Sequence, residues 1–162
     1  KVRVCAIYNK SKLHKLYYNK YGGLTNYHPT RTDDDAKRLI APAFKIASSR
    51  GKTTDVSFTS AQQRCAAYQE DGYGAGRWRI PTEAEIEFIV GLSANGKIPT
   101  LFDGEYWSAS GLYYDSDDQD FHPEDEAPWD GIAVRCVYDI WYWGEKPSTT
   151  DKNSFAYRDV IE

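Results

Sequence analysis

The stretch GRWRIPTEAEIEFI, residues 76 to 89, decides the fold of this chain because it marks where a helix begins. Thr82 is the predicted N-cap, and Glu85, three residues later, completes a capping box. Pro81 holds Ile80 extended and so sets the first helical residue. The acidic side chains of the first turn also favour the positive end of the helix dipole. Helix capping therefore explains these carboxylates better than a catalytic carboxylate pair, which is the less favoured alternative.

This helix is expected to bury a stripe formed by Ile86, Ile89 and Val90 and to end at Asn95-Gly96. Trp78, just ahead of it, is expected to lie in the core at the turn that leads into the helix. If so, the opening stretch is a structural element and not a binding site.

A second helix is predicted upstream, in SFTSAQQRCAAYQEDGYG, residues 57 to 74. Thr59 and Gln62 have the spacing of a capping box, and Asp71-Gly72 supplies a stop. One face carries Ala61, Cys65 and Tyr68 at helical spacing, so Cys65 should point inward.

Strands are predicted where β-branched and aromatic residues cluster, at residues 2–8, 44–47, 104–110 and 131–139. The polar, tyrosine-rich segment 12–35 is predicted to be mostly a solvated loop, with a binding face as the alternative.

Composition limits the function classes. A length of 162 residues fits one domain, and a net charge of −4 gives no basic surface for nucleic acid or anionic membranes. No apolar run approaches the roughly 18 residues of a spanning helix. The start at Lys1, without methionine or a signal-like segment, is expected for a mature protein or an excised domain. The 13 tyrosines and 5 tryptophans indicate either an exposed contact surface or an aromatic-rich core.

Motifs for catalysis are missing from the sequence. It contains no HExxH, P-loop, nucleophile elbow or CxxC motif, and His14, His28 and His122 show no ligand spacing. We therefore expect no catalytic residues, no protein-bound metal and no cofactor.

Residues 111–130, GLYYDSDDQDFHPEDEAPWD, show no periodicity and are predicted to be a long functional loop. Aromatic faces can stack on sugars or apolar protein patches, and the acids accept hydrogen bonds. The eight carboxylates also suit Ca²⁺, although a solvated acidic loop is the default interpretation. The candidate ligand-binding residues are Tyr113, Tyr114, Asp115, Ser116, Asp118, Phe121, His122, Trp129 and Asp130.

The chain resembles a bacterial C-type-lectin-like domain in a combination of four features. These are the inward cysteine on a helix and the motifs W-R-I-P-T-E-A-E, Y-W-S-A-S and V-R-C-V. The resemblance is to the branch related in fold to formylglycine-generating enzymes, and most closely to C-terminal domains of surface and pilus-tip proteins of Bacteroides-type bacteria. It covers roughly residues 44–144. It implies an α+β fold, with two helices flanking a small twisted antiparallel sheet and a long loop region that presents the ligand site. The N-terminal strand would pair with the C-terminal one. Residues 1–144 would form a single domain, and residues 145–162 an exposed tail or edge segment.

The same resemblance implies a Cys65–Cys136 disulfide between the first helix and the last strand. The alternative is two buried thiols in a cytosolic protein. Cys5 is left over, either buried or paired outside this chain. Formylglycine-generating enzymes use a pair of reactive cysteines, and such a pair is lost if Cys65 and Cys136 are structural. HPED (122–125) and WDG (129–131) only partly match the calcium-binding tripeptides of sugar-binding lectins.

The function implied is that of a non-catalytic, extracellular adhesion domain that binds a host glycan, a host protein or another pilus subunit. A hypervariable ligand-display protein diversified by a retroelement is the first alternative, and a template repeat beside a reverse-transcriptase gene would identify it. An enzyme of the formylglycine-generating type is the second alternative and would need demonstrated turnover.

Overall fold

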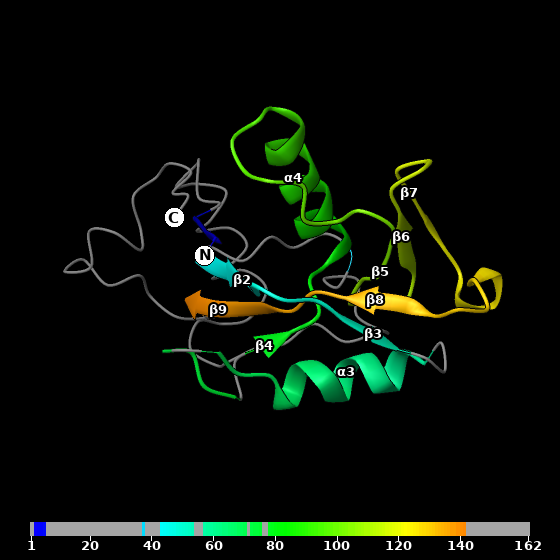
Figure 1. The fold of residues 1–162 in the computed structure, drawn as a ribbon, viewed down its shortest axis with the longest axis horizontal. Coiled ribbons are helices and arrows are strands. Elements are labelled where there is room, and N and C mark those ends of the chain that lie inside the picture. The colour runs from blue at the N-terminus through cyan, green and yellow to red at the C-terminus, as the bar shows by residue number, and fades with distance from the viewer. Residues whose placement is uncertain are drawn as a thin grey trace, which may run out of the picture.

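The computed structural model describes residues 2–5, 37, 43–53, 57–70, 72–75 and 78–141, and the following statements concern these alone. They form an α+β structure, the predicted class (Figure 1). No helix among them is long and apolar enough to cross a membrane. The elements are β1 (Val2–Cys5), β2 (Ala43–Ile46), β3 (Gly51–Thr53), α3 (Phe58–Ala67), β4 (Trp78–Arg79), α4 (Glu83–Ala94), β5 (Glu105–Trp107), β6 (Tyr113–Asp115), β7 (Asp120–His122), the 3-10 helix η2 (Glu124–Glu126), β8 (Ile132–Val134) and β9 (Val137–Trp141).

The described strands form two sheets, whereas one antiparallel sheet was predicted. A four-stranded sheet has the order β1-β2-β9-β4, and a five-stranded sheet has the order β3-β8-β5-β6-β7. The second sheet is mixed, because β5 pairs with β8 in parallel. Helices α3 and α4 lie on opposite sides of the sheets (Figure 1).

The predicted pairing of the N-terminal strand with the C-terminal one is wrong. Strand β1 pairs with β2, and β2 lies between β1 and β9. The burial of β2 explains this arrangement, because Phe44 is 0% and Ile46 1% exposed. A strand with such residues is stabilised most in the sheet interior, with a neighbour on each edge.

The single strand predicted over residues 131–139 is two strands, β8 and β9, in different sheets. The chain changes sheets at Arg135 and Cys136. The Arg135 guanidinium donates hydrogen bonds to the carbonyl oxygens of Leu101 (3.0 Å) and Ala47 (2.9 Å). The Ala47 amide in turn donates to the Cys136 carbonyl oxygen (2.9 Å). These bonds satisfy backbone groups where the strand breaks.

Helix α4 begins as predicted. Thr82 Oγ1 accepts a hydrogen bond from the Glu85 amide (3.0 Å), and Glu85 Oε1 accepts one from the Thr82 amide (2.9 Å), which confirms the capping box. Ile86 and Ile89 are fully buried, and Val90 packs against the same core at its edge. The helix ends at Asn95, as expected.

The sequence did not indicate the partner of Glu85. Arg79 donates two hydrogen bonds to its carboxylate, from Nη1 to Oε1 (2.8 Å) and from Nη2 to Oε2 (2.9 Å). The pair is buried, since Glu85 is 0% and Arg79 7% exposed. The last carboxylate of RIPTEAE, that of Glu85, is therefore engaged in an ion pair and a helix cap.

Helix α3 begins two residues earlier than predicted. Its N-cap is Ser57, whose hydroxyl accepts a hydrogen bond from the Ser60 amide (3.2 Å), so the Thr59 assignment is wrong. The buried ring of Phe58 packs edge-on against Trp107 (5.6 Å between centroids), which favours placing Phe58 in the first turn. Ala61 and Cys65 face the core, as predicted.

The core has two apolar clusters. One lies with α4 and contains Ile86, Ile89, Tyr106 and Tyr114. The other lies with α3 and contains Cys65, Trp78, Trp107 and Tyr113. Trp78 is 3% exposed and contacts Tyr68 and Tyr138 edge-on, which confirms its place in the core.

Cys65 and Cys136 are bonded to each other, with their sulfur atoms 2.09 Å apart, in the pairing that the lectin-like resemblance implies. The bond joins α3 to the point where the chain passes from β8 to β9. Of Cys5, only the backbone position in β1 is described.

We expect the double substitution Cys65→Ser, Cys136→Ser to lower the free energy of unfolding by about 2–4 kcal/mol, because the bridge closes a long loop of the unfolded chain. The sequence separation of the two cysteines is 71 residues. Chemical denaturation of the oxidised protein and the double variant measures the difference. Peptide mapping of the non-reduced protein, produced in an oxidising compartment, should recover the linked pair, and two free thiols there would contradict the pairing.

Candidate functional site

Residues 111–130 are not the aperiodic loop that the sequence suggested. Strands β6 and β7 form an antiparallel hairpin at the edge of the five-stranded sheet, in which Tyr113 pairs with His122 and Asp115 with Asp120. The 3-10 helix η2 follows directly. Figure 1 shows this region at the opposite end of the molecule from β1. The candidate residues from Tyr113 to His122 therefore belong to a folded edge of the sheet, whereas Trp129 and Asp130 lie in the turn before β8.

Tyr113 and Tyr114, two of the predicted ligand-binding residues, are buried, with only 5% and 2% of their surface exposed. Neighbouring residues of a strand point to opposite faces, and each face of β6 meets one core cluster. The Tyr113 hydroxyl donates a hydrogen bond to the Glu126 carbonyl oxygen (2.8 Å), which ties η2 to β6. Burial, followed by the nearby charges of Glu126 and Asp115, raises the pKa of Tyr113. Both rings belong to the scaffold that carries the surface.

The tip of the hairpin is held by hydrogen bonds from its own side chains. Asp115 Oδ1 accepts a hydrogen bond from the Asp117 amide (2.9 Å), and Asp118 Oδ1 accepts one from the Asp120 amide (3.1 Å). Ser116 Oγ accepts a hydrogen bond from the Gly104 amide (2.8 Å), which fastens the tip to the start of β5. These hydrogen bonds fix the conformation of the turn and therefore the positions of its exposed aspartate side chains.

His122 lies between two carboxylates. Its Nε2 is 2.7 Å from Asp118 Oδ2, and its Nδ1 is 3.7 Å from Glu126 Oε2. Desolvation lowers the pKa of His122, but the hydrogen bond and charge of Asp118, with the charges of Glu126 and Asp120, outweigh it and raise this pKa above its usual value.

One candidate group for a metal ion occurs among the described residues. It consists of Asp115, Asp118 and His122, each of which offers one ligand atom, and these atoms lie within 4.8 Å of one another. The sequence expectation was that no histidine shows ligand spacing. The motif D-x-x-D-x-x-x-H becomes a cluster only when the chain reverses at the hairpin.

Trp129 is 92% exposed, and it is the one large hydrophobic residue so exposed in the described part of the chain. It occupies a tight turn with the exposed Asp130, closed by a hydrogen bond from the Gly131 amide to the Pro128 carbonyl oxygen (3.2 Å). Gly131 has a φ of 93°, which favours glycine at this position. Phe121 is half-buried against the α4-side cluster. Of the predicted aromatic site residues, only Trp129 presents a whole ring to solvent.

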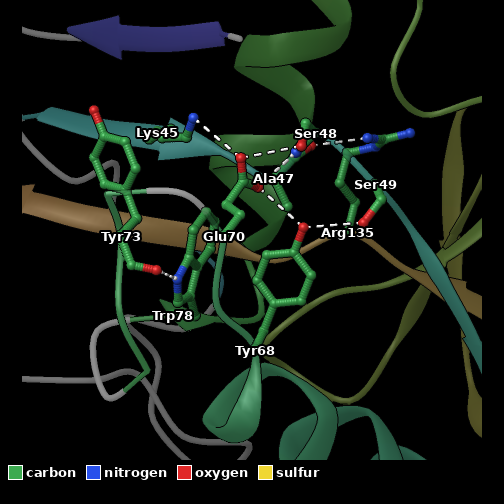
Figure 2. Close-up of polar contacts among 9 residues, drawn as sticks. All are labelled: Lys45, Ala47, Ser48, Ser49, Tyr68, Glu70, Tyr73, Trp78 and Arg135. Carbon is green, nitrogen blue, oxygen red and sulfur yellow. Dashed lines mark hydrogen bonds and ion pairs between the residues drawn. The ribbon is translucent and has the colours of Figure 1, made fainter.

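A second polar cluster surrounds Glu70, at the bridge formed with Tyr73 (Figure 2). Glu70 Oε1 accepts hydrogen bonds from the Ser48 amide (2.9 Å) and the Tyr68 hydroxyl (3.0 Å). Lys45, only 1% exposed, places Nζ 3.3 Å from Glu70 Oε2 and 4.4 Å from the Tyr73 ring centroid. Desolvation favours the neutral form of Glu70. The hydrogen bonds from Ser48 and Tyr68 and the nearby Lys45 ammonium outweigh it and hold the pKa of Glu70 below its ordinary value.

A surface pocket of about 550 Å³ adjoins this cluster and is lined by Gln69, Glu70, Gly72, Tyr73 and Gly74. Both Glu70 carboxylate oxygens are already engaged, by Ser48, Tyr68 and Lys45. The cluster therefore joins β2 to the segment after α3, and we assign it a structural role.

The motifs behind the lectin-like resemblance lie at these elements: RIPTEAE leads from the end of β4 into the first turn of α4, YWSAS begins in β5, and VRCV spans the change from β8 to β9. The acidic and aromatic residues of the predicted loop divide between a buried scaffold and an exposed edge. Searches against protein-family models, curated proteins and solved structures gave no match to this chain.

Proposed function

We propose that this chain is a non-catalytic extracellular ligand-binding or adhesion domain with a C-type-lectin-like fold, of the kind found in bacterial surface and pilus-tip proteins. Its ligand is a glycan or a protein, and its site is the exposed part of residues 115–130, which we call the hairpin edge. The candidate ligand-contacting residues there are Asp115, Ser116, Asp118, Phe121, His122, Trp129 and Asp130.

The exposed ring of Trp129 is the observation that carries this proposal. Tryptophan is highly buried on average, and a 92% exposed indole leaves a large apolar surface in water. A ligand that covers the ring removes its apolar surface from water, and this burial contributes favourably to the free energy of binding. An indole face packs against the C–H groups of a sugar or against an apolar protein side chain, and Asp130 beside it adds a hydrogen-bond acceptor.

The scaffold beneath the hairpin edge also supports a recognition role. Tyr113 and Tyr114 pack β6 into both core clusters. Ser116, at the hairpin tip, accepts a hydrogen bond from the Gly104 amide. A rigid support keeps the entropy cost of binding low. The Cys65–Cys136 bond fits an oxidising compartment, which supports an extracellular location.

The lectin-like fold is supported by three arrangements. Two helices lie on opposite sides of the sheets, a disulfide joins α3 to the chain ahead of β9, and the RIPTEAE run supplies the capping box of α4. The non-catalytic role is supported by the use made of Glu85, whose carboxylate is committed to Arg79 and to the helix cap.

We expect Trp129→Ser to remove binding to the ligand while leaving the melting temperature within a few degrees of the original value, because the ring is exposed. A glycan and protein array, run with and without Ca²⁺, identifies the ligand, and titration of that ligand compares the variants. Trp129→Tyr should retain part of the affinity, since it keeps an aromatic face. Gln63→Ala, on the exposed side of α3, is the control and should bind as the original protein does.

Unchanged ligand affinity in a folded Trp129→Ser variant would place the site elsewhere. The tyrosine-rich segment 17–27, which lies outside the described residues, would then be the next region to test.

A further inference from the structure

The cluster of Asp115, Asp118 and His122 differs chemically from the acidic surface around it. It holds an imidazole nitrogen as well as two carboxylates, and the three ligand atoms converge within 4.8 Å. The neighbouring acids Asp117, Asp120 and Asp125 are exposed and take no part in the group. Mixed nitrogen and oxygen donors are typical of sites for zinc and related transition metals.

The hairpin brings the three side chains together. His122 lies opposite Tyr113 in the ladder, so its ring stands next to the strand that ends at Asp115. Asp118 follows within the turn, and its Oδ2 lies 2.7 Å from His122 Nε2. In each aspartate the Oδ1 atom accepts a backbone hydrogen bond, so the Oδ2 atom is the one that faces the group, and that of Asp118 already contacts His122.

The far side of the imidazole also suits a metal ligand. A histidine that binds a metal through one nitrogen commonly directs the other toward a carboxylate, which orients the ring. Glu126 Oε2 lies 3.7 Å from His122 Nδ1 and can take this part after a small side-chain rotation. The Glu126 main chain is fixed, because its carbonyl oxygen accepts the hydrogen bond of Tyr113.

We propose that Asp115, Asp118 and His122 bind a divalent transition-metal ion of the zinc class. Ligand atoms lie about 2.0–2.2 Å from such an ion. Binding requires the three exposed or half-exposed side chains to close around it from their separation of up to 4.8 Å. The ion takes the place of the proton in the hydrogen bond between His122 Nε2 and Asp118 Oδ2, and this proton is released to solvent. Three protein ligands leave at least one coordination position for water or for a group on a bound partner.

This site goes beyond the proposed adhesion function and is tested separately from it, because the probe is the metal ion alone. Isothermal titration of the whole 162-residue chain with Zn²⁺ should show one site that His122→Gln and Asp118→Asn each weaken by more than about tenfold. Both substitutions are close in size to the original residues, and thermal melts verify that the variants fold. Asp117→Asn and Asp125→Asn are the matched controls and should bind Zn²⁺ as the original chain does.

Three results would overturn the proposal. The first is equal weakening by the control variants, which would indicate diffuse attraction to the acidic surface. The second is Zn²⁺ affinity unchanged in both His122→Gln and Asp118→Asn. The third is Ca²⁺ binding more tightly than Zn²⁺ at this site, since calcium prefers sites made of oxygen ligands. If Trp129→Ser did not affect ligand binding, the proposed adhesion site would be wrong, but the metal-site proposal would not be contradicted.

Discussion

A variant in which Tyr113 and Tyr114 are both replaced by serine is expected to be unfolded at 25 °C. Truncation of a large buried aromatic side chain costs about 3–5 kcal/mol, so two such changes cost on the order of 6 kcal/mol or more. This loss is comparable to the whole stability of a typical domain, about 5–15 kcal/mol. The two rings pack in different clusters on opposite faces of β6, so each substitution removes contacts that the other leaves in place.

Circular dichroism and chemical denaturation of four chains test this expectation: the original, the double variant, and Tyr113→Phe and Tyr114→Phe singly. Tyr113→Phe removes only the hydrogen bond to the Glu126 carbonyl oxygen and should cost about 1 kcal/mol. Tyr114→Phe should be closer to neutral. A double serine variant that melts like the original protein would show that the rings are exposed and return them to the candidate site.

The second large effect is expected for Glu85→Ala, which should lower the free energy of unfolding by about 3–5 kcal/mol. The substitution leaves the buried guanidinium of Arg79 without its bidentate carboxylate partner, and breaking a buried ion pair from one side typically costs this much. It also removes the acceptor for the Thr82 amide in the capping box.

Urea denaturation of Glu85→Ala, Thr82→Ala and Glu87→Ala separates these contributions. Thr82→Ala removes the cap alone and should cost about 1 kcal/mol. Glu87 is exposed on the same helix, and its substitution should change stability by less than about 0.5 kcal/mol. If Glu85→Ala cost no more than Thr82→Ala, the Arg79 pair would be a minor contributor and the carboxylate a cap only.

Local signals predicted where both helices lie and where α4 begins, because capping and helical periodicity act between residues close in the chain. The predicted stop of α3 at Asp71-Gly72 is wrong, since the helix ends at Ala67 with Tyr68 as its C-cap. Thr82 and Glu85 are three residues apart, and their hydrogen bonds require only that the chain enters a helix there. The inward face of α3 follows from spacing alone, as the burial of Ala61 and Cys65 confirms. The error at Thr59 arose because Ser57 and Thr59 are both good N-caps, and the contact of Phe58 with Trp107 favours the earlier start.

Strand pairing could not be predicted from the same signals. The segment 131–139 carries β-branched residues on both sides of Arg135, and a single charged residue in a strand does not by itself indicate a change of sheet. That change depends on Leu101 and Ala47, which are distant in sequence and accept the Arg135 hydrogen bonds. The position of β2 between β1 and β9 likewise depends on pairing between strands that are far apart in the sequence.

The candidate site divides in the same way. By itself, the sequence determined the two helices, the inward cysteine and the acidic, aromatic composition of residues 111–130, because these depend on residue type and short spacing. Only the tertiary structure decided that Tyr113 and Tyr114 are core, that Trp129 is exposed, and that Asp115, Asp118 and His122 converge. The physical reason is that burial and convergence depend on which surfaces pack on each face of β6 and on where the hairpin turns, and those surfaces come from distant parts of the chain.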